Sequence, residues 1–386
     1  MLARAENSGA ARPALVDMVA TQQKAREFEK PRLKRQRRAH TVAADLDQSS
    51  ARTALQQLSV TAPTRKQYEK ILAELATWIT SRRASPLCEE EWDALVAALM
   101  DEWFFEGQGA NSGEKLLAAV LWKLPQFGRS AGGRMIQSRQ ALKGWRRVFP
   151  PGGRLPLPMA VVAMLAMEIL WKGRPDIAVL VLLMMETYCR PSEPMRLRVR
   201  DVVPGQNKTG VRATAILLHP FECGVPAKNQ QFDQTVLLDL PRHKALASAL
   251  LRLCAGRRDD ELVFSRAPPS LGPLFHEMGS QLRIEALGAL HPYRLRHTGA
   301  SFDFASSVRS LEQIQKRGRW NDPRSLRRYE HGGRLNELFA RLEPDVIKHA
   351  LKCEKLLPKV LSLQLSPCRC PWLRQSSWSS LQAQHD

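Results

Sequence analysis

The sequence predicts a mostly α-helical protein with a small antiparallel sheet, divided into two folded domains. Apolar residues recur at helical spacing along most of the chain between residues 61 and 318. Two short runs rich in β-forming residues, 211–218 and 235–240, lie within the second half. A segment rich in proline and glycine, 150–158, cannot form a helix and separates the two halves.

The first domain is expected to span residues 52–150 and to consist of helices alone. Its first helix starts near residue 61, where Thr64 can act as the N-cap. Three further helices are expected at about 88–105, 113–124 and 134–148. Its tryptophans favour a hydrophobic core over a base-stacking surface; they are Trp78, Trp92, Trp103, Trp122 and Trp145.

The second domain is expected to span residues 155–345 and to be helical around a small inserted sheet. Its strands are the two β-rich runs, with 199–203 as a weaker candidate. Its helices are expected at about 159–171, 175–188, 245–254, 271–287, 297–306 and 311–318. We expect residues 346–386 to form a poorly ordered tail, because the end of the chain lacks convincing periodicity.

The composition points to a basic protein that binds a polyanion. The 386 residues include 58 Lys and Arg against 38 Asp and Glu, which leaves a formal charge of +20. No apolar run is long enough to span a membrane, so no membrane partner is expected. The chain shows no HExxH motif, no paired CxxC and no glycine-rich nucleotide loop, so neither metal nor cofactor is expected. Seven scattered cysteines favour a reducing compartment over a disulfide framework.

Residues 1–51 are polar and basic, and we expect them to form a mostly disordered arm. The cluster KPRLKRQRR starts at Lys30 and indicates either a nuclear-import signal or an arm that contacts the DNA backbone. The alternative is a solvated linker. The candidate DNA-binding residues of this cluster are Lys34, Arg35, Arg37 and Arg38. The cluster predicts a nuclear location in a eukaryote, and otherwise a cytoplasmic one.

Two segments of the second domain place arginines at helix ends. Arg190 lies where a buried apolar helix ends, and Glu193 follows three residues later, close enough to orient the guanidinium. Arg296 and His297 follow a proline that starts a helix, where backbone N–H groups and Arg together favour an anion. The alternatives are a helix-terminal salt bridge and an ordinary basic helix face.

A third segment, 318–329, places a tyrosine among cations. Trp320 follows Gly318 and Arg319 in a turn, and Tyr329 comes nine residues after Trp320. Taken alone, an exposed tyrosine of this kind is structural. Its meaning depends on the other two segments.

Together the three segments resemble the tyrosine recombinase (phage integrase) family over residues 155–345. That family carries an Arg in a GLRxSE-like helix junction, a Lys on a β-hairpin and a HxLRHT motif. A His or Trp after a Gly follows, and then a Tyr nine residues later. The matching residues here are Arg190 with Glu193, Lys228, Tyr293 with Arg296 and His297, Trp320, and Tyr329.

The resemblance implies an enzyme that cuts and rejoins DNA without metal or ATP. Tyr329 would attack a backbone phosphorus and form a 3′-phosphotyrosyl link. Arg190 and Arg296 would hold the nonbridging phosphate oxygens, and Trp320 would donate its indole N–H to one of them. Lys228 would protonate the departing 5′ oxygen. Lys208 is a second candidate for that role.

One residue departs from the family pattern. Tyr293 stands where the family usually has His, and tyrosine is a poor general base at neutral pH. His291 or His297 can compensate; otherwise the site is slow or inactive. Activity therefore depends on what surrounds this position.

The resemblance further implies double-stranded DNA as partner, clamped between two domains. Protomers would form dimers on a site and tetramers at synapsis, as in integration by a mobile element. Apolar residues after Tyr329 either pack on their own domain, which we favour, or dock on a neighbouring protomer; they are Leu335, Leu338, Phe339 and Leu342. The alternatives are a catalytically inactive DNA-binding protein on the same scaffold, a type IB topoisomerase, and an unrelated basic nuclear or RNA-binding protein.

Overall fold

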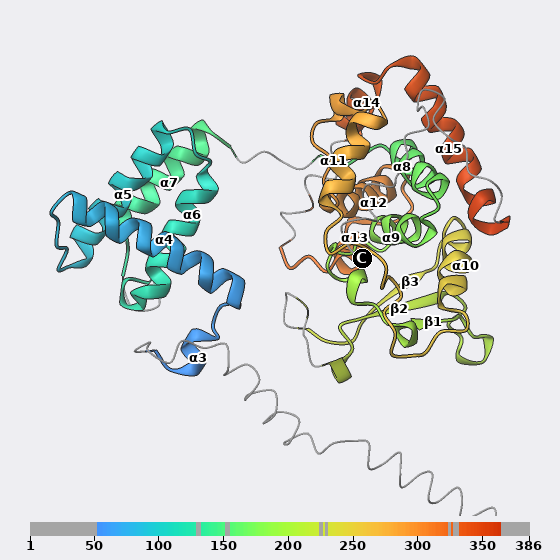
Figure 1. Cartoon of the computed structure of the whole chain (residues 1–386), viewed down its shortest axis with the longest axis horizontal. Helices are drawn as coiled ribbons and strands as arrows, with labels where there is room; N and C mark the ends of the chain where they lie inside the picture. The colour runs from blue at the N-terminus through green and yellow to red at the C-terminus, as the bar shows by residue number, and fades with distance from the viewer. Residues whose placement is uncertain are drawn as a thin grey trace, which may run out of the picture. The chain divides into compact units, whose positions relative to one another are not determined.

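The computed structural model describes residues 52–128, 133–150, 155–223, 227, 231–322, 326 and 332–363. The chain divides into two compact units between Gly152 and Gly153 (Figure 1). Each unit encloses a hydrophobic core of its own.

The described part of the N-terminal unit is helical. Its elements are α3 (Ala54–Gln57), α4 (Ala62–Ser81), α5 (Glu89–Phe105), α6 (Ala110–Lys123), the 3-10 helix η1 (Pro125–Phe127) and α7 (Ile136–Val148). Apolar side chains from α4 to α7 fill the centre, among them Leu75, Val96 and Leu116. Trp103 and Trp145 are also buried there, so these two rings belong to the core.

Acidic side chains of α5 fix the start of α7. The buried Asp93 carboxylate accepts hydrogen bonds from the backbone N–H groups of Gln137 and Ser138, at 2.7 and 2.8 Å. Glu89 accepts another from the N–H of Met135 at 2.7 Å. The first N–H groups of a helix have no partner within it, and carboxylates stabilise them both as acceptors and as negative charges.

The C-terminal unit surrounds two apolar helices. Its described helices are α8 (Met159–Trp171), α9 (Pro175–Glu186), α10 (His243–Cys254), α11 (Gly272–Gln281), α12 (Tyr293–Ala305), α13 (Leu311–Gly318), α14 (Gly332–Ala340) and α15 (Pro344–Leu363). Residues 160–169 of α8 and 177–186 of α9 are buried without interruption. Because α9 is buried on all sides, packing holds its C-terminal end in place within the unit.

A three-stranded antiparallel sheet is inserted between α9 and α10. Its strands β1 (Val202–Val203), β2 (Thr214–Leu218) and β3 (Gln234–Leu238) lie in the order β1-β2-β3, with Ile216 opposite Val236. Short 3-10 helices accompany this sheet and the loop before α12: η3 (Pro194–Arg196), η4 (Val199–Asp201), η5 (Asn207–Thr209), η6 (Phe221–Cys223) and η7 (Glu285–Leu287). The predicted fold class, mostly α with a small antiparallel sheet, is confirmed.

The C-terminal end of the described chain corrects one prediction. Residues 346–386 were expected to be a poorly ordered tail, but residues 346–363 form most of α15, which packs on α8 and α10. Its buried positions recur every three or four residues and include Val346, Ala350, Cys353 and Leu357. This apolar stripe holds the helix across Pro358, which itself removes one backbone hydrogen bond.

Two further expectations are settled by the described residues. Helix α12 begins at Tyr293, four residues before the expected start, so Tyr293, Arg296 and His297 all lie in its first turns. In the ranges that the structure describes, no helix is long and apolar enough to cross a membrane.

Candidate functional site

The end of α9 turns sharply and presents Arg190. Tyr188 takes a left-handed conformation with φ of +51°, which breaks the helix. The carboxylate of Glu193 then accepts the backbone N–H of Arg190 at 2.8 Å and its Nη1 at 2.7 Å. Glu193 is buried, whereas the side chain of Arg190 stays 19% exposed. The pair therefore holds one edge of the Arg190 guanidinium and leaves part of the group open to solvent.

Arg296 reaches the same turn from α12 and is fully buried. Its Nη1 donates to the carbonyl of Tyr188 at 2.5 Å, and its Nη2 donates to the carbonyl of Gly318. These partners are neutral, so the charge of Arg296 forms no ion pair with a carboxylate of the described chain. Burial first, and then repulsion from Arg319 and Arg190, lowers the pKa of Arg296 to about 10.

Trp320 covers the Arg296 guanidinium. The centre of its ring lies 4.5 Å from the Arg296 Cζ atom, a cation–π distance. A side chain at position 318 would collide with the ring, since a Cβ there would lie 1.7 Å from it, so Gly318 is required. The Trp320 ring thus packs against the face of the Arg296 guanidinium.

Arg319 brings a third guanidinium to the turn. Its Nη2 donates to Glu193 Oε2 at 2.6 Å, and its side chain is 6% exposed. Burial pushes the pKa of Glu193 up, but Arg319 above all, together with Arg190 and Arg296, holds it below its ordinary value. Arg190 and Arg319 thus share one carboxylate, Arg296 lies beside them without such a pair, and the cluster keeps a surplus of positive charge.

Tyr293 and His297 lie one helical turn apart on α12. Their ring centres are 5.3 Å apart with the planes tilted by 58°. His297 is buried and Tyr293 is half-buried, and the charge of Tyr293 would favour the charged form of Arg296. His291 is exposed, and its Nδ1 accepts the N–H of Tyr293 at 3.0 Å. Both histidines that were considered as substitutes therefore flank Tyr293.

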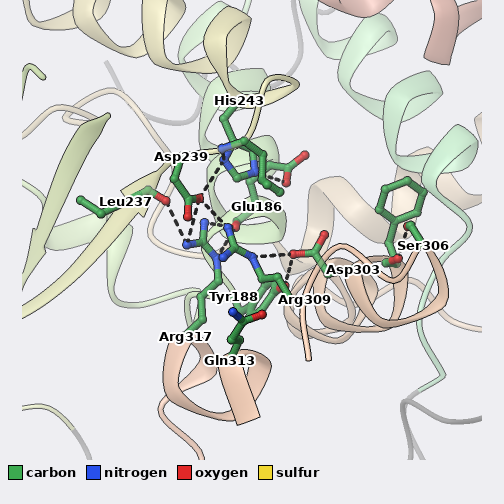
Figure 2. A network of polar contacts seen from close by, with 12 residues as sticks. Glu186, Tyr188, Leu237, Asp239, His243, Asp303, Ser306, Arg309, Gln313 and Arg317 are labelled. Atoms are coloured by element: carbon green, nitrogen blue, oxygen red, sulfur yellow. Dashed lines mark hydrogen bonds and ion pairs between the residues drawn. The ribbon is translucent and has the colours of Figure 1, made fainter. Parts of the chain in front are cut away.

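A buried polar network connects Glu186 and Tyr188, which precede the turn, to the neighbouring helices (Figure 2). Glu186, at the end of α9, accepts hydrogen bonds from Arg242 at 3.0 Å and from Nε2 of His243 at 2.8 Å. The Tyr188 hydroxyl donates to Asp303 of α12, which also pairs with Arg309 at 3.1 Å. The network joins α9, α10 and α12 around the residue whose carbonyl holds Arg296.

Arg317 caps the C-terminal end of α9. Its Nε and Nη2 donate to the carbonyl of Glu186 at 3.1 and 2.7 Å, and its Nη1 donates to that of Leu237 on β3 at 2.9 Å. The last carbonyls of a helix lack partners and carry partial negative charge, so a guanidinium is well suited to them. This contact ties α13 and β3 to the turn (Figure 2).

Several predicted site residues fall outside the described part of the chain. These are Tyr329, Lys228, Lys34, Arg35, Arg37 and Arg38. Lys208, the second candidate lysine, is exposed on η5. Of the predicted residues that the structure describes, it brings together Arg190, Glu193, Arg296, Trp320, Tyr293 and His297.

Sequence reasoning missed two residues of the cluster. Arg319 was noted only as the neighbour of Trp320, and His219, whose Nε2 lies 3.9 Å from Glu193 Oε1, was not noticed. Arginine at the end of a predicted helix, next to a glycine, was the available signal for Arg319. His219 follows β2 and reaches the cluster only through the fold of the sheet.

Among the residues described, no group of His, Cys, Asp and Glu could hold a metal ion.

The apolar residues after Tyr329 pack on their own unit. Leu338 and Leu342 are 3% and 4% exposed and belong to its hydrophobic core, and Phe339 packs against it. Leu335 is half-buried on the same helix, α14.

Comparisons with known proteins give a likeness to solved structures but not to families or curated proteins. No protein-family model matches the chain, and no curated protein matches it. Among solved structures, the chain is similar to the crystal structure of XerA recombinase, with 15% sequence identity and a TM-score of 0.35. The similarity covers 74% of this chain and 94% of that one.

Proposed function

We propose that this protein cuts and rejoins double-stranded DNA through a covalent bond to Tyr329. The observation that supports it best is the group of three arginines, Arg190, Arg296 and Arg319, which meet at the turn of residues 188–193. Arg190 and Arg319 pair with Glu193 there, and Arg296 binds the carbonyl of Tyr188. A surplus of fixed guanidinium groups is suited to the charge that develops on a phosphate in strand transfer.

In the proposed reaction the Tyr329 hydroxyl oxygen bonds to the phosphorus while the bond from phosphorus to the 5′ oxygen breaks. The phenol gives its proton to solvent, and the departing 5′ oxygen takes one from Lys228, the proposed donor. Arg190 and Arg296 hold the nonbridging oxygens throughout. Because the phosphodiester energy stays in the phosphotyrosyl link, the reverse attack by a 5′ hydroxyl rejoins the strand.

Tyr293 favours a second candidate, a DNA-binding protein on the same scaffold without catalysis. It stacks on His297 at a position where a histidine would supply a proton acceptor. Such a protein would bind duplex DNA with the same salt dependence and form no covalent adduct.

Covalent trapping separates the two candidates. The protein is incubated with a pool of duplexes that carry random sequence beside a nick, so that the short 5′-hydroxyl fragment diffuses away after cleavage. We expect adducts that survive denaturation and that Tyr329→Phe abolishes. We expect Arg190→Gln to reduce their yield by about 10²- to 10³-fold, the usual cost of removing one transition-state donor.

Two results would contradict catalysis by Tyr329. One is the lack of adduct with the wild-type protein, and the other is an undiminished adduct with Tyr329→Phe. If duplex binding persists without adduct, the second candidate stands.

The same proposal has three further parts: assembly as dimers on a site and tetramers at synapsis, mobile-element integration, and nuclear location of a eukaryotic chain. Light scattering of protein–DNA complexes tests the assembly.

A further inference from the structure

Arg319 occupies a backbone conformation that favours glycine. It is the C-cap of α13, with φ of +56° and ψ of +42°. For a residue with a Cβ this left-handed conformation is unfavourable, and helices commonly end with glycine there. An arginine at this position needs contacts that offset the cost.

The contacts of Arg319 converge on the turn that carries Arg190. Its Nη2 lies 2.6 Å from Glu193 Oε2, 3.5 Å from the carbonyl oxygen of Tyr188 and 3.8 Å from the Sγ atom of Cys189. These atoms belong to three residues, all within positions 188–193. Arg319, at the end of α13, therefore contacts both the start and the end of the turn that carries Arg190.

Glu193 links the two arginines. Its Oε1 accepts Nη1 of Arg190 at 2.7 Å, while its Oε2 accepts both Nη2 of Arg319 and the backbone N–H of Arg190. With both oxygens bonded, the carboxylate cannot rotate, and its direction sets that of the Arg190 guanidinium. Removing Arg319 would leave a buried carboxylate with less positive charge beside it and with hydrogen bonds to Arg190 alone, so that both groups are held less firmly.

We propose that Arg319 is a positioning residue, which fixes Glu193 and through it points the Arg190 guanidinium at the bound phosphate. The part that concerns the phosphate rests on the proposed function. The part that concerns the order of Arg190 does not, and it can be measured without DNA.

The first measurement is chemical labelling of arginines. Phenylglyoxal modifies accessible guanidinium groups, and mass spectrometry of peptides reports the rate at each arginine. In the folded Arg319→Gly protein we expect Arg190 to react about tenfold faster, which corresponds to losing one hydrogen bond to a charged group. Exposed Arg258 serves as an internal reference, since its side chain is 77% exposed.

The matched control is Arg83→Gly. Arg83 has nearly the same left-handed conformation, with φ of +54°, and is exposed in the N-terminal unit. The substitution removes the same charge and relieves the same backbone cost, so the Arg190 labelling rate should stay at the wild-type value. An unchanged Arg190 rate in Arg319→Gly would overturn the proposal.

The second variant, Glu193→Gln, tests whether Arg319 acts on Arg190 through Glu193. If Arg319 acts through Glu193, Glu193→Gln alone speeds Arg190 labelling by a similar factor, and the double variant adds nothing further. Independent, multiplying effects would instead mean that Arg319 acts on Arg190 directly, and would overturn the route through Glu193. The Glu193→Gln variant alone still tests the link between Glu193 and Arg190 where Arg319→Gly folds poorly, because it leaves Arg319 in place.

The DNA-dependent measurement is the rate of adduct formation at saturating duplex. We expect Arg319→Gly to lower this rate at least tenfold while the duplex dissociation constant stays within about twofold, as for loss of an interaction made in the transition state. A normal rate in Arg319→Gly would reject the phosphate part although the proposed function stands. Lack of adduct in the wild-type protein rejects the proposed function, and the labelling result still decides the order of Arg190.

Discussion

At the scale of the residue, Arg296 carries a buried charge whose partners in the described chain, two carbonyl groups and the Trp320 ring, are all neutral. Burial disfavours the protonated form, which lowers its pKa to about 10 and makes the folded state less stable at neutral pH than it would be with a neutral group. That loss of stability shrinks as the pH rises through about 10, because the Arg296 guanidinium then loses its proton and becomes neutral. A bound anion would remove the same loss at neutral pH.

We therefore predict that inorganic phosphate raises the melting temperature of the C-terminal unit at pH 7.5, compared with chloride at equal ionic strength. The increase should shrink above pH 10, where Arg296 loses its proton. Arg190→Gln should remove most of it, and Arg258→Gln, which changes an exposed arginine, should not. Differential scanning fluorimetry measures all of these. Equal increases in both variants would show that phosphate binds elsewhere on this basic protein.

At the scale of the element, the packing of α12 on α9 sets the distance between the arginines. Gly299 of α12 faces the last turn of α9, and a Cβ there would lie 2.0 Å from the carbonyl oxygen of Met185 and 2.9 Å from the Tyr188 ring. A residue with a side chain would force the helices apart. The close approach lets Arg296, one turn earlier, reach the carbonyl of Tyr188.

We predict that Gly299→Ala lowers the free energy of unfolding of the C-terminal unit by about 2–3 kcal/mol, the usual cost of overpacking. The matched substitution Gly144→Ala, on α7 where a Cβ would meet nothing within 4 Å, should stabilise its helix by roughly 0.5–1 kcal/mol. Hydrogen exchange followed by mass spectrometry resolves the two units in one experiment. A harmless Gly299→Ala would mean that α12 does not approach α9 this closely in solution.

The polar network around Glu186 belongs to the same scale. Burial raises the pKa of Glu186, but the hydrogen bond from His243, together with the charge and hydrogen bonds of Arg242, lowers it below the ordinary value. The Nδ1 of His243 accepts the N–H of Leu240 at 3.1 Å, so Nε2 carries the proton that it donates to Glu186. A carboxylate with a lowered pKa stabilises the fold above its unfolded pKa and loses that contribution as pH falls through the folded value.

At the scale of the whole molecule, the net charge of +20 would govern DNA binding in the proposed function. Each Lys or Arg that contacts a phosphate releases counterions, so affinity falls steeply with salt. The side chains of Arg296 and Arg319 in the candidate site are buried and that of Arg190 is only 19% exposed, whereas the basic cluster from Lys30 is predicted to lie in an arm. Salt dependence therefore reports mostly on residues outside the candidate site.

We predict that changing Lys34, Arg35, Arg37 and Arg38 together to glutamine reduces the slope of log affinity against log salt by about 3 to 4, if each contacts one phosphate. Fluorescence anisotropy with a labelled duplex across a salt series measures the slope. Arg319→Gly should leave it unchanged, because that side chain is buried. An unchanged slope in the fourfold variant would make the cluster a linker or an import signal without DNA contact.

The sequence by itself determined the elements and one contact of the candidate site. Helical periodicity located α8, α9 and α13, and the proline-rich segment located the division of the chain, because these signals depend on neighbouring residues alone. The pair of Arg190 and Glu193 was within reach for the same reason: three residues separate them, and a turn brings them together.

Only the tertiary structure decided which distant groups meet. Arg296 binds carbonyls that are 108 and 22 residues away, and Arg319 reaches Glu193 across 126 residues. Helix α15 is ordered because a core formed by earlier helices accepts its apolar stripe, which its weak sequence signal did not reveal. Periodicity records how each segment folds against its own neighbours, whereas such contacts arise from the packing of whole elements, and backbone carbonyls, which any residue supplies, leave no mark in the sequence.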